Sequence, residues 1–406
     1  MQFSSEFDYS AASLPDYAPR FVDVLSEGND VGYFVVDRTV LGRAWGGFRV
    51  ATDLSLSEVK ILARTMTMKN MLAGVPIGGA KAGISSQMKT IGREKLLDLA
   101  SRLIGRYIRT QSYFLGTDIG FKERDANQVY ELAGSRRRIF SGRLSPGICC
   151  AHSVLASIEF VKRMNPRLEA ETVALEGFGA MAIPTAKLLT SEGYRIVAVS
   201  NIDGTLQDSA RLNVEELTRL TTILQGNILS HYASVHPSAT FRSHESINSE
   251  KCDILIPGAR VFSINEETAN QVKAKLVCPL ANSPITVTGE DILARRGIIS
   301  VPDLISSSGA LIGSFAQQLG ASEAQTRRII DNIIKCNLKN ILEPVSSRNP
   351  KLLALDIAMK RIKSLEQSER ITALRWLTPW LREFGVSSIL RALRQYLSIK
   401  AFKTLA

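Results

Sequence analysis

Two lysines and one aspartate are residues whose type and surroundings could support acid–base chemistry. Lys69 lies in MTMKN, within a run of helical apolar spacing, and Lys81 lies in the glycine-rich stretch PIGGAKAG. A lysine acts as a base near neutral pH only if its pKa falls by about three units, which burial beside a second cation can produce. Lys69 and Lys81 could supply such a pair, although by spacing alone each is more typical of an ordinary surface residue. Asp118, in GTDIG, lies between a predicted strand and a predicted helix, where loops often carry chemistry.

The elements around these residues follow from apolar periodicity and from caps. Residues 31–50 are rich in β-branched and aromatic residues and predict strands. Ser55 or Ser57 can cap a helix that carries Lys69. We expect the remaining elements of this half to be an irregular opening with short helix at 1–30, a glycine-rich loop at 76–83, a helix at 94–109 and a strand at 113–116.

A glycine turn in the second half matches the G-x-G-x-x-A pattern of dinucleotide-binding proteins. It is made of Gly177, Phe178, Gly179, Ala180, Met181 and Ala182. The first glycine allows a tight turn, the second lets the backbone approach a pyrophosphate, and the helix that follows attracts the anion with its N-terminus. The turn follows an apolar strand and precedes a helix and a second strand, RIVAVS, which is the context that the pattern requires. A tight strand–helix turn in another α/β enzyme is the alternative.

The choice between NAD and NADP is open at this stage. A carboxylate at the end of the second strand would bind the ribose of NAD. That end reads Ser-Asn-Ile-Asp, with neutral Asn201 where an acid is often found and with Asp203 two residues later. Asn201 and Asp203 are therefore both candidate cofactor-binding residues.

Strands that alternate with helices predict an α/β fold with a parallel sheet covered on both faces. The chain has 406 residues, which is long for one core and favours two domains with the active site in the cleft between them. We predict a substrate-binding, catalytic and oligomerisation domain at 1–148, a Rossmann domain at 149–330, helices packing back on the first domain at 331–365, and a basic amphipathic helical extension at 366–406.

Composition excludes several classes of function. Apolar residues make up 45% and charged residues 22%, and no apolar run is long enough to span a bilayer. The five cysteines show no metal-ligand spacing and the four histidines do not pair, so we expect no metal site, and we expect a reducing cytoplasm. The net charge of +11 is spread along the chain without a nucleic-acid-binding motif, and it suits anionic substrates and a phosphorylated cofactor.

Several blocks resemble the glutamate/leucine/phenylalanine/valine dehydrogenase family and occur in the family order. They are GGFRVATDLSLSEVKILARTMTMKNMLAGVPIGGAKAGI, GTDIG, EGFGAMA, CDILIPGA, AKLVCPLANSP and VPDLISSSGALIGS, within about residues 31–365. The resemblance implies a homo-oligomeric enzyme that converts an L-amino acid to the 2-oxo acid and ammonia with NAD or NADP. It implies that Lys69 binds the substrate carboxylate, that Lys81 is the catalytic lysine and that Asp118 transfers protons. Further implied positions are Gly46, Gly47 and Gly78 lining the site by backbone, Asn282 near the cofactor, and Ser314 near the substrate side chain.

One departure from the family pattern bears on the substrate. Glutamate enzymes of the family carry a lysine just before the Gly-Gly pair, and this chain has Trp45 there. The resemblance therefore favours the leucine/phenylalanine type and an apolar or aromatic substrate. Two other interpretations stay open: a non-catalytic, nucleotide-sensing homologue, and an imine or oxoacid reductase of specialised metabolism. For the C-terminal extension we expect a helix docked on its own or a neighbouring subunit, with a membrane-surface helix and a partner-binding helix as alternatives.

Overall fold

The chain divides into two compact units in a computed structural model. One unit combines residues up to Ser141 with residues from Ile357 onward, and the other is Gly142–Asp356. The structure describes residues 18–40, 42–86, 91–136, 143–224, 226–343 and 349–367. The predicted extension at 366–406 lies, apart from its first two residues, outside the described residues. The two units are described separately below.

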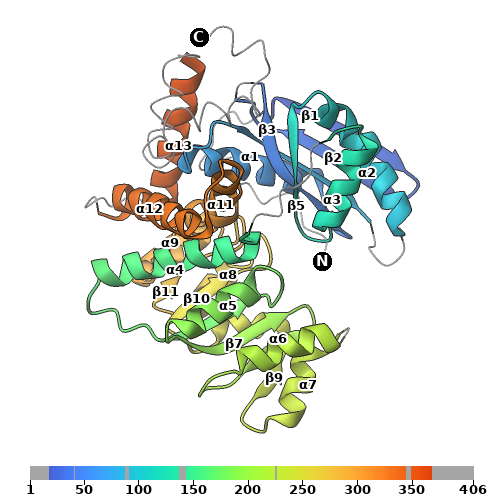
Figure 1. The fold of residues 1–406 in the computed structure, drawn as a ribbon. Coiled ribbons are helices and arrows are strands. Elements are labelled where there is room, and N and C mark those ends of the chain that lie inside the picture. The colour runs from blue at the N-terminus through green and yellow to red at the C-terminus, as the bar shows by residue number, and fades with distance from the viewer. Residues whose placement is uncertain are drawn as a thin grey trace. The chain divides into compact units, whose positions relative to one another are not determined.

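The first unit is built on a five-stranded mixed sheet with the order β1-β2-β4-β3-β5 (Figure 1). Its strands are β1 (Phe21–Glu27), β2 (Asp30–Val36), β3 (Ala44–Ala51), β4 (Gly78–Ser85) and β5 (Tyr113–Thr117). Strands β1 and β2 form an antiparallel hairpin, and β2 also pairs antiparallel with β4. Strand β3 runs parallel to both β4 and β5, so the carboxyl ends of these three strands meet at one edge.

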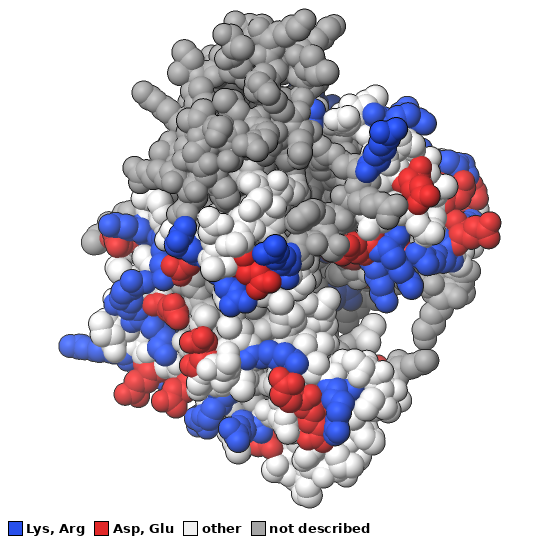
Figure 2. All heavy atoms as spheres, in the orientation of Figure 1, with Lys and Arg blue, Asp and Glu red and all other residues white. Residues whose placement is uncertain are grey.

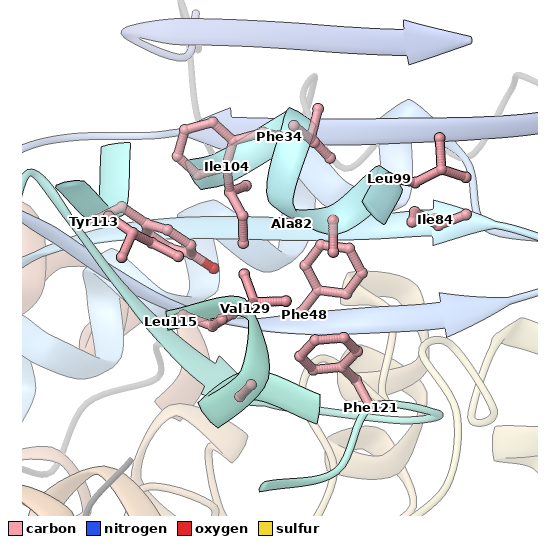
Figure 3. Packing of buried hydrophobic residues seen from close by; sticks show 14 of the residues in the cluster. Phe34, Phe48, Ala82, Ile84, Leu99, Ile104, Tyr113, Leu115, Phe121 and Val129 are labelled. Carbon is pink, nitrogen blue, oxygen red and sulfur yellow. The ribbon is translucent and has the colours of Figure 1, made fainter. Parts of the chain in front are cut away.

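Helices cover both faces of this sheet. Helices α2 (Arg93–Arg109) and α3 (Glu123–Leu132) cover the face on which Phe34, Phe48 and Tyr113 are buried (Figure 3). Helix α1 (Leu56–Leu72) packs on the opposite face, where Val59 and Ala63 meet Val35. Ser55 caps α1 by accepting a hydrogen bond from the amide of Glu58, which agrees with one of the two predicted caps.

Two local predictions in this half were wrong. Lys81 lies within strand β4 and not in a loop, because the glycines around it allow the strand to pack closely on its neighbours. A Cβ atom at Gly79 would lie 2.2 Å from the backbone nitrogen of Thr67 in α1. Residues 21–27, which were predicted as irregular or helical, form strand β1, an edge strand whose mixed composition hides its alternation.

The second unit contains a seven-stranded sheet with the order β12-β11-β10-β6-β7-β8-β9. The strands are β6 (Thr172–Glu176), β7 (Arg195–Asn201), β8 (Gly204–Gln207), β9 (Thr240–Arg242), β10 (Ile254–Pro257), β11 (Leu276–Val277) and β12 (Ile299–Ser300). Strands β12 to β7 are parallel, whereas β8 and β9 add antiparallel at the β7 edge. The chain leaves β6 in one direction for β7 and later returns to its other side with β10. That reversal marks the place where open α/β sheets bind ligands.

Helices alternate with the strands of this half as predicted. They are α4 (Pro146–Met164), α5 (Ala182–Ser191), α6 (Val214–Ile223), α7 (Ile228–Val235), α8 (Glu266–Gln271) and α9 (Val287–Arg295). After the last strand come α10 (Asp303–Ser306), α11 (Gly309–Gln318), α12 (Glu323–Leu342) and α13 (Pro350–Gln367), and α13 continues past Asp356 into the first unit. Helix α4 packs against α5, α11 and α12. The predicted two-domain α/β class is confirmed. In the described part of the chain no helix has both the length and the apolar character needed to cross a membrane.

Charged side chains of both signs lie interspersed over the face of the second unit that Figure 2 shows. Several belong to exposed ion pairs, such as Lys187 with Glu215 at 3.0 Å. On this face the positive excess of the chain is therefore not gathered into one patch.

Candidate active site

Lys81 and Asp118 form a buried ion pair in the first unit. The Nζ atom of Lys81 in β4 lies 2.6 Å from Oδ2 of Asp118, which directly follows β5. The Lys81 side chain is 3% exposed and that of Asp118 is 15% exposed. Burial lowers the pKa of Lys81, and nearby Arg49 lowers it further, while Asp118 opposes both. The structure thus brings together two of the predicted site residues, with the lowered lysine pKa that base chemistry needs.

Two glycines allow close packing in the part of the sheet that carries this pair. A Cβ atom at Gly47 would lie 2.5 Å from the carbonyl oxygen of Thr117 and 3.1 Å from Cβ of Asp118, so glycine is required there for β3 and β5 to pack. A Cβ atom at Gly116 would lie 3.6 Å from Nε1 of Trp45. The Trp45 indole therefore reaches from β3 across to β5, where a flat apolar ring could serve as a wall for a substrate side chain.

The other two predicted lining glycines are explained by crowding within the sheet. A Cβ atom at Gly46 would lie 1.7 Å from the carbonyl oxygen of Ala80, and one at Gly78 would lie 2.0 Å from that of Arg38. Glycine is thus required at both positions for backbone packing alone. Their part in lining the site stays a prediction.

Lys69 is buried on α1, one turn before the end of that helix, with 5% of its surface exposed. The neighbouring Asn70 donates from Nδ2 to the carbonyl oxygen of Gly78 at 2.9 Å, which fastens the segment between α1 and β4. The Oδ1 atom of Asn70 is buried without a hydrogen-bond partner. Lys69 is therefore an interior cation rather than the surface residue that its spacing alone suggests.

Two charged residues that the sequence analysis did not single out complete this cluster. The Nε atom of Arg49 in β3 lies 2.9 Å from Oδ2 of Asp118, and its Nη1 lies 2.5 Å from Oε1 of Glu58 in α1. Period-two alternation along β3 could have found Arg49, since it puts Trp45, Gly47 and Arg49 on one face.

The predicted dinucleotide turn connects β6 to α5 in the second unit. Gly177 has a φ of +90°, and its amide donates to Oγ of Ser200 at 3.2 Å. A Cβ atom at Gly179 would meet no atom within 4 Å, so open space lies beside the turn. Phe178, Ala180 and Met181 lie in the same turn, and α5 begins without an acidic residue or a side-chain cap. These features fit the pyrophosphate of a dinucleotide.

A buried carboxyl group adjoins this turn. Oε2 of Glu176 accepts a hydrogen bond from Oγ of Ser263 at 3.0 Å and from the amide of Ala259 at 3.4 Å. Burial raises the pKa of Glu176, so its carboxyl is less readily ionised than an ordinary one. Glu176 therefore fastens the loop after β10 beside the glycine turn.

Asn201 and Asp203 meet at the end of β7. Oδ1 of Asn201 accepts hydrogen bonds from the amides of Asp203 and Gly204, at 2.8 and 3.2 Å. Nδ2 of Asn201 lies 3.3 Å from Oδ2 of Asp203, which is exposed. The amide of Asn201 thus shapes the turn, and ribose binding by either residue stays a prediction.

Asn282 lies in the loop that follows β11, near the edge where β6 and β10 also end. The next residue, Ser283, has a φ of +49°, and its amide donates to Oδ2 of buried Asp303 at 2.8 Å. Ser314 lies half-buried in α11. The predicted cofactor residues Gly177, Gly179 and Asn282 are thus all at the carboxyl ends of parallel strands, where ligands of such sheets bind.

The described residues contain no group of three or more His, Cys, Asp or Glu that could hold a metal ion. The first unit offers a buried lysine–carboxylate pair, and the second offers a turn that fits a dinucleotide. Each feature by itself is of the kind found in α/β oxidoreductases with a nicotinamide-type cofactor.

Comparison with known proteins agrees with that class. Residues 147–368 match the family model of Glutamate/Leucine/Phenylalanine/Valine dehydrogenase, and residues 26–132 match that of the Glu/Leu/Phe/Val dehydrogenase dimerisation domain. An NADP-specific glutamate dehydrogenase from Saccharolobus shibatae is 28% identical over 307 residues, 71% of this chain and 70% of that protein. An NADP(+)-dependent glutamate dehydrogenase from Pyrobaculum calidifontis is 28% identical over 335 residues, 76% of this chain and 79% of that protein.

Solved structures share the fold at lower identity. A hetero-hexameric glutamate dehydrogenase from Thermus thermophilus has a TM-score of 0.71 at 21% identity, over 87% of this chain and 90% of that chain. An L-tryptophan dehydrogenase from Nostoc punctiforme has a TM-score of 0.58 at 19% identity, over 86% of this chain and 97% of that chain.

The chain belongs to the glutamate/leucine/phenylalanine/valine dehydrogenase family and is an amino acid dehydrogenase. The resemblance predicted from the sequence blocks is confirmed at the level of the family. Its lean toward the leucine/phenylalanine type is not settled by these relatives. The names of the curated relatives support the predicted NAD or NADP cofactor, and the match to a dimerisation domain supports an oligomer.

Proposed function

We propose that this chain catalyses the NAD- or NADP-dependent oxidative deamination of an L-amino acid, and the reverse reductive amination. The observation that carries this proposal is the buried Lys81–Asp118 pair, whose Nζ and Oδ2 atoms lie 2.6 Å apart. In the forward direction the amino acid, water and oxidised cofactor give the 2-oxo acid, ammonium, reduced cofactor and one proton. The cofactor supplies hydride acceptance when it is bound.

Lys81 acts on water in this scheme. Because burial lowers its pKa, a larger fraction of Lys81 is neutral near physiological pH than for a solvated lysine. Neutral Nζ takes a proton from water as the water oxygen attacks the substrate carbon that has lost its hydride. Asp118, ionised and in contact with Nζ, takes that proton from Lys81 and passes it to the substrate nitrogen. Neutral Lys81 then removes the proton of the new hydroxyl group, so that the carbonyl forms as the carbon–nitrogen bond breaks and ammonia leaves.

Lys69 binds the substrate carboxylate in this proposal. A buried ammonium group gains more from an anionic partner than an exposed one, because water screens it less. Its position on a helix that is buried along most of its length keeps that charge in place.

Trp45 favours a substrate with an apolar or aromatic side chain. An unpaired carboxylate against an indole would lose hydration without gaining a partner, which costs several kcal/mol. Ser314 could donate one hydrogen bond to a polar tip but cannot neutralise a charge.

Glutamate is the second candidate, and one observation favours it. Arg43 is buried and directly precedes β3, two residues before Trp45. Its guanidinium carbon lies 5.5 Å from the centroid of the Phe114 ring. If that guanidinium turned toward the substrate, it could pair with a second carboxylate. Curated relatives named as glutamate dehydrogenases give this candidate further support.

A substrate panel tests the proposal. The common amino acids are assayed with NAD and with NADP while formation of reduced cofactor is followed, and glutamate, leucine and phenylalanine are then compared by kcat/KM. A clear preference for glutamate would overturn the apolar assignment, and Arg43→Ala would then be expected to abolish that preference. Cofactor binding without turnover of any amino acid would instead favour the nucleotide-sensing alternative.

Trp45 is the residue through which the apolar assignment is tested. We expect Trp45→Lys to shift the ratio of kcat/KM values toward glutamate by tenfold or more, since an ion pair replaces a desolvated carboxylate; tenfold corresponds to about 1.4 kcal/mol. Trp45→Phe is the matched control, because it keeps an apolar wall and adds no charge. An unchanged ratio in Trp45→Lys would remove Trp45 from the side-chain pocket.

The remaining parts of the proposal concern assembly and location. The dimerisation-domain match supports a homo-oligomer, and the free thiols at all five cysteines suit the reducing cytoplasm.

A further inference from the structure

Arg49 is a second cation at the proposed catalytic pair, beside that of Lys81, and the proposed reaction gives it no role. Its side chain is 9% exposed. It lies on the face of β3 that also carries Trp45 and Gly47, and the adjacent Phe48 pairs in register with Thr117, the residue before Asp118. The sheet register therefore brings the Arg49 side chain directly against Asp118.

The contacts of the Asp118 carboxylate are unequal. Oδ2 lies 2.6 Å from Nζ of Lys81 and accepts a hydrogen bond from Nε of Arg49 at 2.9 Å. Among the described residues, Oδ1 has one longer contact, from Nη2 of Arg49 at 3.4 Å. A planar guanidinium that meets both oxygens fixes the plane of a carboxylate, which the single point charge of a lysine cannot do. Oδ1 therefore keeps lone pairs to spare for a further donor.

Glu58 supports Arg49 from the other side. Its Oε1 lies 2.5 Å from Nη1 of Arg49, and it stands in the first turn of α1. Lys81, Asp118, Arg49 and Glu58 carry two positive and two negative charges, so the buried cluster is neutral as a whole. Removing one member leaves an uncompensated charge near the other three.

We propose that Arg49, held by Glu58, is a positioning residue of the reaction: it turns Oδ1 of Asp118 toward the substrate and sets the pH range in which Lys81 and Asp118 work. This inference rests on the proposed function of that pair. Arg49 itself touches no reacting atom in the proposal and acts through Asp118.

The sign of the pH effect follows from the surrounding charges. The cation of Arg49 lowers the pKa of Lys81, adding to the larger effect of burial, and it helps Lys81 to hold the pKa of Asp118 well below its usual range. Without Arg49 both pKa values rise, so neutral Lys81 forms only at higher pH. The charged side chains on the elements packed against Lys81 are Arg49 in β3, Asp118 after β5, Glu58, Lys69 and Arg64 in α1, and Asp37 after β2, where it pairs with Arg64.

Arg49→Met and Arg49→Lys separate the two parts of this role. Arg49→Met removes the charge, and we expect the acidic limb of the kcat/KM profile for deamination to move up by about one pH unit, with kcat reduced about tenfold. Arg49→Lys keeps the positive charge but loses the planar guanidinium. The acidic limb of the kcat/KM profile should therefore lie at the wild-type pH, while kcat stays low. Glu58→Gln leaves an extra positive charge beside Lys81, so the limb should move slightly down.

Arg64→Met is the matched control. Arg64 is buried to a similar degree, with 8% of its side chain exposed, and it pairs with Asp37 at 3.3 Å. The charges that shift the pKa of Lys81 are those of Asp118, Arg49 and Glu58. Its loss should lower the melting temperature and leave the pH limb in place. The melting temperature and the affinity for reduced cofactor, measured on every variant, show that each retains its fold.

The outcomes distinguish this inference from the function on which it rests. If Lys81→Ala abolishes turnover while folded Arg49→Met keeps the wild-type pH limb and kcat, Arg49 is structural and the inference is wrong. If Lys81→Ala keeps turnover, the proposed function fails and this inference falls with it. If Arg49→Met does not fold, the other two variants test the proposal. It would be overturned by an unchanged kcat in Arg49→Lys together with an unchanged acidic limb of the kcat/KM profile in Glu58→Gln.

Discussion

The buried carboxyl group of Asp118 in the first unit and those of Glu290 and Glu176 in the second have pKa values shifted in opposite directions. Burial would raise the pKa of Asp118, but Lys81 and Arg49 together outweigh it and hold that pKa well below its usual range. At Glu290 and Glu176 burial dominates, and it raises the pKa of Glu290 to about 7 and also raises that of Glu176. Asp118 is thus charged at neutral pH, whereas Glu290 is about half protonated.

The cause of the difference is the placement of the nearby cations. Two cations contact Asp118 directly. Near Glu290 the available cation is Lys351, which pairs with Asp303 at 3.3 Å and donates to the carbonyl oxygen of Ile285 at 2.8 Å. The Oε1 atom of Glu290 is buried without a hydrogen-bond partner.

The difference suits what each unit is proposed to bind. Proton transfer needs a charged carboxylate with a proton donor in contact, which the first unit provides. In the proposal a dinucleotide brings a negative pyrophosphate to the turn at Gly177, and the raised pKa of the adjacent Glu176 makes a repelling negative charge there less readily formed. The comparison therefore separates a carboxylate whose charge is stabilised for chemistry from carboxyl groups whose ionisation is opposed by burial.

The largest effect is expected in the charged cluster. Lys81→Ala and Asp118→Asn should each lower kcat by at least ~10²-fold, the usual scale of acid–base catalysis, while cofactor still binds. Steady-state kinetics together with a cofactor titration measure this. Near-normal turnover in either variant would show that the corresponding residue is not catalytic.

The second prediction concerns Glu290. Its folded pKa of about 7 lies above its unfolded value, so the carboxyl destabilises the fold progressively as pH rises from about 4.5 to 7, by roughly 3 kcal/mol in all. Glu290→Gln should remove this loss and make the protein more stable than the wild type at pH 8, with little difference at pH 5. Denaturant unfolding at both pH values measures the change, and Glu215→Gln, at an exposed position, is the control that should show no such pattern. Equal pH dependence in Glu290→Gln and the wild type would mean that Glu290 ionises normally.

The smallest effect is expected at the glycine turn. A Cβ atom at Gly179 would meet no atom within 4 Å, so we expect Gly179→Val to fold and to obstruct the cofactor. We expect the dissociation constant for cofactor to rise about tenfold or more, or about 1.4 kcal/mol. Gly226→Val, at another glycine with open space around it, should leave cofactor affinity unchanged. If the two variants bind cofactor equally well, the pyrophosphate lies elsewhere.

The sequence predicted most of the fold because local signals agreed with one another. The cap at Ser55, the strand–turn–helix at Gly177 and the alternation of strands with helices in the second half each use short-range patterns. Strand β4 was missed because its glycines serve contacts with α1 that are distant in sequence. For the same reason the sequence does not show that glycine is required at position 79, because the requirement comes from contact with Thr67 in α1.

The site was predictable in its residue types but not in its electrostatics. Lys81 and Asp118 were found through a family resemblance, and only the register of β3 with β5 shows that Arg49 joins them. The carboxyl groups of Glu176 and Glu290 gave no sequence signal, since their burial is a property of the packed chain.

Helix α1 lies against the sheet so closely that Gly79 has no room for a methyl group. It carries Glu58 in its first turn and Lys69 near its last, eleven residues or about 16 Å apart along the axis. A helix packed in this way has little freedom to slide or tilt. The distance between Glu58, which contacts Arg49, and Lys69, which is proposed to bind the substrate carboxylate, is therefore set by the backbone. New substrates would therefore be accommodated by exchanging single side chains such as Trp45, while displacement of the main chain would disturb both ends of the site at once.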